Sequence, residues 1–265
     1  MHKKIIVRIA EGLGNQLFMY ANSLALSKKF NCELNIDNTS GYFKKKNQNR
    51  SYILDKFNIS ANLSDKNLRF DNYYLDIKRK YLKKTDFLRK NKRFIIEKLD
   101  DNKKTFFSDH SSGSFSNNIF VEGHFESERY FDNYKNIIKK EFIIKDQFLD
   151  ANNYSKMLSD TNSVSIALRR NRFSEGYKKD NIKSEKFFLN TIDYINKSIE
   201  LVKTKIPNPK FFIWSNDFTD MENYYDPSEF IFIKNVKNKI LNDFDLFKYS
   251  KHFIVGPTSF HWWGA

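Results

Sequence analysis

Short apolar runs rich in β-branched residues alternate with longer helix-like segments along most of the chain. The first pair is "KKIIVRIA" (3–10) and, after a glycine-containing turn, "NQLFMYANSLALSKKF" (15–30), in which Leu17, Ala21 and Leu24 share one helical face. Strands that alternate with helices form parallel sheets covered on both faces, so the sequence predicts an α/β fold. The other predicted strands are 32–37, 119–125, 163–170, 210–217, 230–234 and 252–257, and the other predicted helices are 127–142, 184–205, 243–250 and 259–265.

Residues 40–118 lack this alternation. They are polar and basic, and we expect them to be helical in pieces, with a loop at 108–118. A chain of 265 residues, of which 17% are aromatic, can bury the cores of two domains. The polar stretch near 150–162 is the expected hinge, so we predict an N-terminal domain at 1–155 and a C-terminal domain at 156–265.

The net charge of +14 is concentrated in part at residues 78–93, which contain nine basic residues and one acid. A solvated helix face is the first explanation, and docking to an anionic membrane surface is the second. We expect no nucleic-acid partner, because no motif for one accompanies the charge. The single cysteine, Cys32, suits a reducing compartment, and no apolar run is long enough to span a bilayer. We therefore expect a cytoplasmic protein, with peripheral docking at the inner membrane as the alternative.

Unusual residues follow three of the predicted strands: "EGLGNQ" (11–16), "RRNRF" (169–173) and "PTSF" (257–260). Ligands of open α/β sheets bind beyond the carboxyl ends of the strands, so these stretches predict one site shared by the two halves. Arginines at a strand end suit an anion. Thr258 and Ser259 stand where a helix should begin, which suits either a phosphate or ordinary N-capping. The "GLG" turn alone favours a tight strand-to-helix turn, because it lacks the third glycine of a dinucleotide fingerprint.

Five blocks of sequence resemble those of the bacterial α-1,2-fucosyltransferases, glycosyltransferase family 11. "GLGNQLFMYANSLAL" resembles the opening motif, "VEGHFESERYF" the middle motif, and "VSIALRRNRF" the V-x-H-x-R-R-G-D-Y segment. "FFIWSNDF" resembles the F-S-D-D strand, and "DFDLFKYSKHFIVGPTSFHWWGA" resembles the closing block. The blocks occur in family order over nearly the whole chain. The chain departs from the family pattern at Glu11, Glu126, Ala167, Asn171, Arg172, Phe173, Pro257 and His261.

The resemblance implies a GT-B-like fold, in which two Rossmann-type halves face a cleft. It implies an inverting enzyme that moves fucose from GDP-fucose to a galactose-containing glycan or lipid-linked oligosaccharide, in surface polysaccharide or lipopolysaccharide synthesis. No metal or other cofactor is expected. The first half would be the acceptor side and the second half the nucleotide-sugar side. Family members continue past the closing block, so the resemblance also implies a second domain truncated at its C-terminus.

The same resemblance assigns roles on the donor side. Arg169 matches the first arginine of the family segment and is expected to neutralise the β-phosphate of departing GDP, since guanidinium groups suit that task. Arg170 alternates to the opposite face of the strand and is expected either to bind donor or to brace the loop. Asp243 is expected to accept from the N1–H and 2-amino groups of guanine. The donor side is completed by Thr258, Ser259 and Phe260.

On the acceptor side, Glu11 is the expected catalytic base, since inversion needs a carboxylate or histidine near the acceptor hydroxyl. Glu126 and His124 are the alternatives for that role. The rest of the expected cleft surface is Gly12, Gly14, Asn15, Gln16 and His124. Because the "ALRRNRF" segment is altered, two other functions stay open: a glycosyltransferase for another nucleotide sugar, and a non-catalytic relative that binds a glycan or nucleotide.

Overall fold

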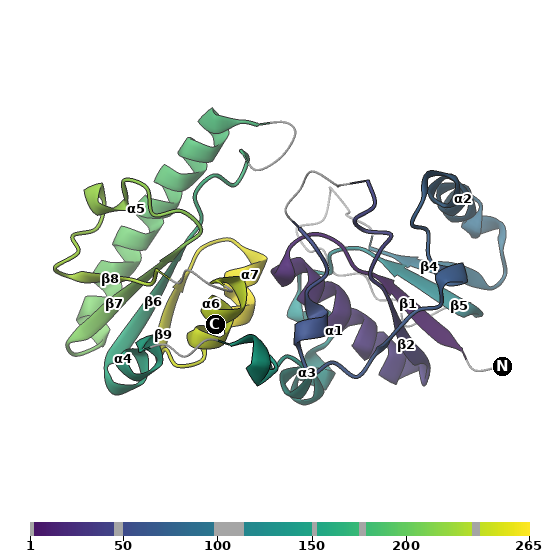
Figure 1. The fold of residues 1–265 in the computed structure, drawn as a ribbon, viewed down its shortest axis with the longest axis horizontal. Coiled ribbons are helices and arrows are strands. Elements are labelled where there is room, and N and C mark those ends of the chain that lie inside the picture. The colour runs from purple at the N-terminus through teal and green to yellow at the C-terminus, as the bar shows by residue number, and fades with distance from the viewer. Residues whose placement is uncertain (1–2, 45–49, 98–113, 150–152, 175–178, 235–238) are drawn as a thin grey trace. The chain divides into compact units, whose positions relative to one another are not determined.

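The computed structural model divides into two compact units, Met1–Lys145 and Asp146–Ala265. Both are built from parallel strands and helices (Figure 1). In the second unit, helices cover both faces of the sheet. The predicted assignment of an acceptor half and a donor half stays a prediction. The residues that the structure describes are 3–44, 50–97, 114–149, 153–174, 179–234 and 239–265.

The first unit contains a five-stranded sheet in the order β3-β2-β1-β5-β4, and its strand pairs are all parallel. Its strands are β1 (Lys4–Arg8), β2 (Glu33–Asp37), β3 (Asn62–Leu63), β4 (Lys92–Ile96) and β5 (Phe115–Glu122), and its helices are α1 (Leu13–Phe30), α2 (Tyr73–Lys84) and α3 (Lys135–Glu141). Helix α1 is buried all round: Leu17, Ala21 and Leu24 lie in the core as predicted, and so do the polar side chains of Gln16 and Ser23.

The second unit contains a four-stranded parallel sheet in the order β8-β7-β6-β9. Its strands are β6 (Asn162–Leu168), β7 (Pro209–Ser215), β8 (Phe230–Phe232) and β9 (His252–Val255), and its helices are α4 (Tyr154–Asp160), α5 (Asn181–Lys205), α6 (Lys239–Phe247) and α7 (Ser259–Gly264). One face of the sheet packs on α5 through Phe188 and Ile195. On the other face, the Trp214 ring of β7 stacks on Phe247 of α6, with centroids 4.5 Å apart.

Most predicted elements are confirmed, and several regions differ. Helix α4 lies within the stretch 150–162 that was predicted only as a polar hinge, and α6 begins before the predicted helix 243–250. Strand β4 was not predicted, because its sequence "KRFII" lies inside a basic run and becomes a strand only by pairing with β5. The predicted loop 108–118 is wrong for Phe115–Asn118, which begin β5, and residues 108–113 lie outside the described part. The predicted helix 127–142 is broken, since Phe131 is non-helical (φ −139°, ψ 13°) and turns its ring into the core against Phe18.

Within the described ranges, none of the helices has the length and apolar character needed to cross a bilayer.

Candidate active site

The loop after β6 is tied to the loop after β7 at the carboxyl edge of the second sheet. The Arg170 backbone N–H donates to Asn216 Oδ1 (2.9 Å), and Asn216 Nδ2 donates back to the Arg170 carbonyl (3.1 Å). Asn171 has a left-handed backbone (φ 60°), and its Nδ2 donates to Asp217 Oδ2 (2.8 Å). Non-glycine residues held in this conformation cluster at functional sites, because the surroundings must over-determine them.

Arg170 directs its side chain toward α5. Its guanidinium carbon lies 5.1 Å from the ring centroid of Phe188, and its Nη2 lies 3.8 Å from Asp220 Oδ2. The side chain is 16% exposed. Of the two roles expected for Arg170, these contacts fit the brace of the loop.

Arg172, which replaces an aspartate of the family pattern, connects the β6 loop to the end of β9. Its Nη1 donates to the Pro257 carbonyl (2.7 Å), and its guanidinium lies 4.9 Å from the ring centroid of Phe187. The segment that departs from the family pattern therefore connects the loop after β6 to the loops after β7 and β9.

Arg169 lies within electrostatic reach of the start of α7. Burial and, to a smaller extent, the positive charges of Arg169 and Lys239 together lower the pKa of His261 to about 3. His261 is thus neutral near pH 7, with its Nδ1 2.7 Å from the Thr258 hydroxyl. Thr258 is an ordinary N-cap, whose Oγ1 accepts from the His261 backbone N–H (3.3 Å). Two half-buried cations, Arg169 and Lys239, therefore act on one buried side chain, an arrangement that suits an anionic ligand.

Asp243, on α6, is buried beside one of those cations. Its Oδ2 accepts from Lys239 Nζ at 2.6 Å. Phe260 packs on the ring of Phe244, with centroids 5.9 Å apart. Ser259 is the first residue of α7. The structure thus gathers the predicted donor-side residues of the closing block around α6 and α7, and their contacts with guanine or phosphate stay predictions.

Glu11 follows β1 in the first unit and has a left-handed backbone (φ 65°). Its Oε2 pairs with Arg50 Nη1 at 2.7 Å, and its side chain is 21% exposed. The Glu11 carbonyl accepts from Gln16 Nε2 (3.0 Å) and from the Tyr42 hydroxyl (3.3 Å). The expected base is therefore reachable from solvent and is held on a fixed turn.

The other predicted acceptor-side residues differ in exposure. Gln16 is fully buried: its Nε2 also donates to the Ser51 carbonyl (2.8 Å), and its Oε1 accepts from the Ile53 N–H (3.0 Å). It holds residues 51–53 against the start of α1. Gly12 is the N-cap of α1, with extended backbone. Gly14 is buried, Asn15 is half-buried, and His124 and Glu126 are exposed.

The family model of glycosyl transferase family 11 matches residues 4–265, which is nearly the whole chain. The chain belongs to glycosyl transferase family 11.

This family 11 chain is 29% identical over 273 residues to the alpha-1,2-colitosyltransferase of Escherichia coli, a match that covers 98% of the chain and 86% of that protein. Its fold is similar to that of fucosyltransferase NodZ from Bradyrhizobium (TM-score 0.58, 12% identity, 100% of this chain and 92% of that one). It is also similar to FUT1 of Arabidopsis thaliana in complex with GDP (TM-score 0.54, 11% identity, 100% and 68%). The predicted α/β, GT-B-like fold is confirmed.

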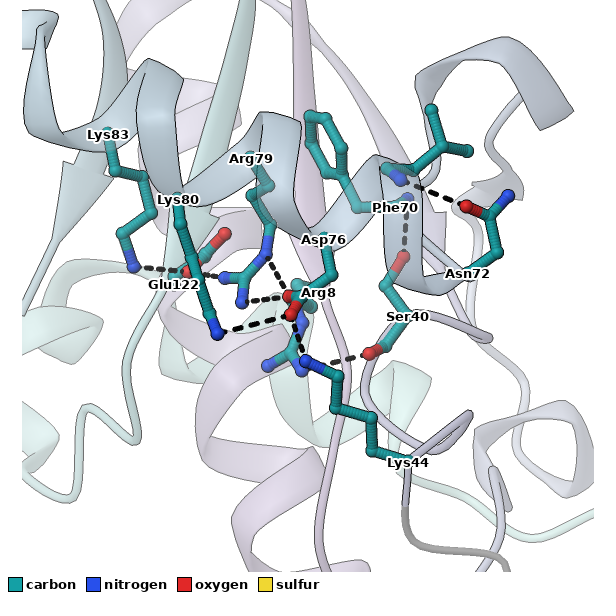
Figure 2. Close-up of polar contacts among 11 residues, drawn as sticks. Arg8, Ser40, Lys44, Phe70, Asn72, Asp76, Arg79, Lys80, Lys83 and Glu122 are labelled. Carbon is teal, nitrogen blue, oxygen red and sulfur yellow. Dashed lines mark hydrogen bonds and ion pairs between the residues drawn. The ribbon is translucent and has the colours of Figure 1, made fainter.

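Sequence reasoning missed a buried network of charges at the carboxyl edge of the first sheet of this glycosyltransferase (Figure 2). Arg79 Nη1 and Lys83 Nζ, both from α2, each lie 2.6 Å from Glu122 Oε2 at the end of β5. Arg79 Nη2 also lies 2.7 Å from Asp76 Oδ1, and Arg8 at the end of β1 donates to the Ser40 carbonyl (2.9 Å). The network places α2 over the ends of β1 and β5.

The carboxyl groups of this network stay ionised. Burial alone would raise the pKa of Glu122, but the charges of Arg79 and Lys83 outweigh it and lower the pKa. Burial opposes ionisation of Asp76 too, and the hydrogen bonds from Lys44 and Arg79 outweigh it. A signal was available in the sequence, because Arg8 and Glu122 are charges that directly follow the apolar runs "IIV" and "IFV".

The network corrects one explanation of the basic segment 78–93. A solvated helix face describes Lys78, Lys80 and Lys84, which are exposed. It is wrong for Arg79 and Lys83, which neutralise the buried Glu122.

In the described part of the chain, no group of three or more histidine, cysteine, aspartate or glutamate side chains has the arrangement of a metal site. Asp243 and Asp245 of α6 bind separate lysines, Lys239 and Lys248, each at 2.6 Å.

Proposed function

We propose that this family 11 glycosyltransferase moves fucose from GDP-fucose to a hydroxyl of a galactose-containing glycan, with inversion at the anomeric carbon, in the synthesis of a surface polysaccharide. The observation that carries the proposal is the gathering of predicted donor-side residues at the start of α7. Thr258 contacts the buried His261 (2.7 Å), Asp243 is paired with Lys239 (2.6 Å), and the charge of Arg169 acts on His261. A lipid-linked oligosaccharide is the acceptor form that we favour.

The chemistry of the proposed reaction needs positive charge at one place. As the sugar leaves, the β-phosphate of GDP gains negative charge, and fixed cations in a water-poor site stabilise it without reorganisation. Arg169 would take that role, because its charge acts on the buried side of the β6 end. Arg170 and Arg172 would hold the loop in place through Phe188, Phe187 and the Pro257 carbonyl.

The test is calorimetric binding of GDP and GDP-fucose to the wild type, Arg169→Ala and the control Lys197→Ala, which removes an exposed cation of α5. Loss of a charge-assisted contact should weaken GDP binding by roughly tenfold to a hundredfold in Arg169→Ala and leave the control unchanged. Equal GDP affinity in all three proteins would refute the phosphate role of Arg169. Binding without sugar transfer to any galactoside would favour the non-catalytic alternative.

A colitosyl donor is the second candidate, and the colitosyltransferase relative is the observation that favours it. Colitose is fucose without the 3-hydroxyl, so a site built to bind that hydroxyl rejects the deoxy sugar strongly. Chromatographic assay of transfer from GDP-fucose and GDP-colitose to the same galactoside separates the two. Faster transfer from GDP-colitose than from GDP-fucose would identify colitose, and not fucose, as the sugar transferred.

Glu11 is the proposed base, and Glu11→Gln keeps its shape while removing its basicity. We expect kcat to fall about 10²–10⁴-fold, the usual contribution of general base catalysis. Glu126→Gln is the matched control, since Glu126 is the exposed alternative. If Glu126→Gln loses the activity and Glu11→Gln keeps it, the base is assigned to the wrong residue. GDP binding by both variants checks that the fold and the donor site are intact.

A further inference from the structure

Helix α2 has its polar and apolar faces reversed relative to an ordinary surface helix. Its inward face carries the buried or half-buried charges of Asp76, Arg79 and Lys83, bound into the network at the sheet edge (Figure 2). Its outward face carries Ile77 and other large apolar side chains that are mostly exposed. Surface helices normally bury their apolar side chains against the core. Packing within the first unit therefore gives no reason for the apolar residues on the outward face of α2.

Three of the exposed apolar side chains form a stripe along α2, and two more lie in the turn that follows it. Tyr74, Ile77 and Tyr81 follow one another at spacings of three and four residues, which places them on one side of the helix. They are 76%, 66% and 66% exposed. Phe87 and Leu88, in the 3-10 turn that follows α2, are 74% and 72% exposed. These five residues are called the α2 patch below.

The exposed charged residues within positions 73–90, the stretch that holds the α2 patch, are all basic. The exposed basic residues between positions 73 and 90 are Lys78, Lys80, Lys84, Arg89 and Lys90. The acids of that stretch are Asp76 and Asp86, and both are buried in ion pairs with arginines. An exposed apolar patch of this kind marks an interaction surface, and its border shows the charge of the partner.

We propose that the α2 patch docks on an anionic lipid bilayer. Tyrosine, phenylalanine, isoleucine and leucine on one face with lysine and arginine around them are the composition of helices that lie in the membrane interface. The apolar side chains enter the boundary between headgroups and acyl chains, and the basic residues bind lipid phosphates. The bilayer then covers the apolar side chains of α2 that the core of the first unit leaves exposed. The docking holds whatever sugar the enzyme transfers, so it stands or falls apart from the proposed donor.

The test is co-sedimentation of the protein with vesicles of phosphatidylcholine alone and of phosphatidylcholine mixed with phosphatidylglycerol. The apolar variant is Ile77→Ser with Phe87→Ser and Leu88→Ser, and the charge variant is Lys84→Glu with Lys90→Glu. The matched control is Ile182→Ser with Leu201→Ser, which removes exposed apolar side chains of α5. Circular dichroism and GDP affinity confirm that each variant is folded.

We expect the wild type to bind the anionic vesicles and not the neutral ones, and to dissociate as salt is added. Replacing two lysines by glutamates should weaken partition by at least roughly 25-fold, since each lost basic residue contributes about fivefold and anionic lipids repel the added acids. The apolar variant should lose at least about tenfold, because each buried CH₂ group contributes to interfacial binding. The control should bind like the wild type.

Three outcomes would overturn the proposal. One is a wild type that does not bind anionic vesicles. Another is a control that loses as much binding as the apolar variant. The last is self-association of the wild type in sedimentation equilibrium, abolished by the apolar variant and without vesicle binding, which would make the α2 patch an interface between copies of the chain.

Discussion

Replacing Glu122 by glutamine tests whether the buried charge network holds the first unit together. Glu122 is 8% exposed and accepts from Arg79 and Lys83 at 2.6 Å each. Glutamine keeps the volume and one acceptor oxygen but leaves both cations without their shared counter-charge. Removing one partner of a buried ion pair costs about 3–5 kcal/mol.

The cost of removing Glu122 should be smaller than this, because both cations have another way to be stabilised. Arg79 keeps Asp76 at 2.7 Å, and the Lys83 side chain, which is 26% exposed, can turn its ammonium group to water. We therefore expect Glu122→Gln to lower the free energy of unfolding by about 2–3 kcal/mol, which is less than the usual cost of breaking a buried pair. The control is Asp193→Asn, which breaks the exposed Lys197–Asp193 pair of similar length (2.8 Å). Its expected effect is within about 0.5 kcal/mol.

Urea unfolding measures both variants with two probes. All three tryptophans, at 214, 262 and 263, lie in the second unit, so their fluorescence follows that unit, whereas far-ultraviolet circular dichroism follows both units. Glu122→Gln should shift the dichroism midpoint without changing the slope m. Equal, small shifts for Glu122→Gln and Asp193→Asn would refute the reasoning, because burial would then add nothing to the pair.

The difference in unfolding free energy between the wild type and Glu122→Gln should change with pH, in a direction set by the pKa of Glu122. The folded-state pKa lies below the ordinary value of 4.5, since the charges of Arg79 and Lys83 outweigh burial. A depressed pKa stabilises the folded protein above the ordinary value, and that stabilisation is lost as the pH falls through the folded-state pKa. The difference between wild type and Glu122→Gln should therefore shrink in acid, and a difference that grows below pH 4.5 would contradict the assignment.

Two further predictions concern the second unit, and tryptophan fluorescence during urea unfolding measures both. Burial and nearby cations lower the pKa of His261 to about 3, so the folded histidine stays neutral while the unfolded one binds a proton as the pH falls below 6.5. Stability should decrease with falling pH in that window by up to about 1.4 kcal/mol per pH unit, and His261→Asn should remove that slope; an unchanged slope would assign it to another group. Gly256→Ala would place a Cβ 2.7 Å from the Ala167 carbonyl oxygen, so it should cost about 1–3 kcal/mol through overpacking. Gly12→Ala, which has no atom within 4 Å of the added Cβ, is its control and should cost less. Because Gly12 lies in the first unit, far-ultraviolet circular dichroism measures both glycine variants.

The regular elements were predictable because their signals are local. The β-branched strands and the helix at 184–205 show in windows of a few residues, and β6, β7 and α5 lie where those windows placed them. Strand β4 was missed because "KRFII" has no such signal of its own. The break at Phe131 was missed because a buried ring, placed by contact with Phe18, overrides the local preference for a helix.

The sequence predicted which residues lie at the strand ends, but it did not predict their contacts. Alternation along a strand placed Arg169 and Arg170 on opposite faces, and Arg170 packs on Phe188 of α5. N-capping was one of the two roles predicted for Thr258, and Thr258 is the N-cap of α7. The contact of Arg172 with the Pro257 carbonyl was not predictable, because these residues are 85 positions apart and meet only when β6 and β9 pair.

By itself, the sequence determined the alternation of strands and helices, the order of the family blocks and the strand ends where charged and glycine-rich stretches lie. Only the tertiary structure decided which face of α2 turns inward. Hydrophobic periodicity favours burial of Tyr74, Ile77 and Tyr81, yet the structure buries Arg79 on Glu122, a residue 43 positions away. The physical reason is that periodicity reports interactions between near neighbours in sequence, whereas a buried carboxylate at the end of β5 takes its counter-charges from whatever segment the fold brings to it.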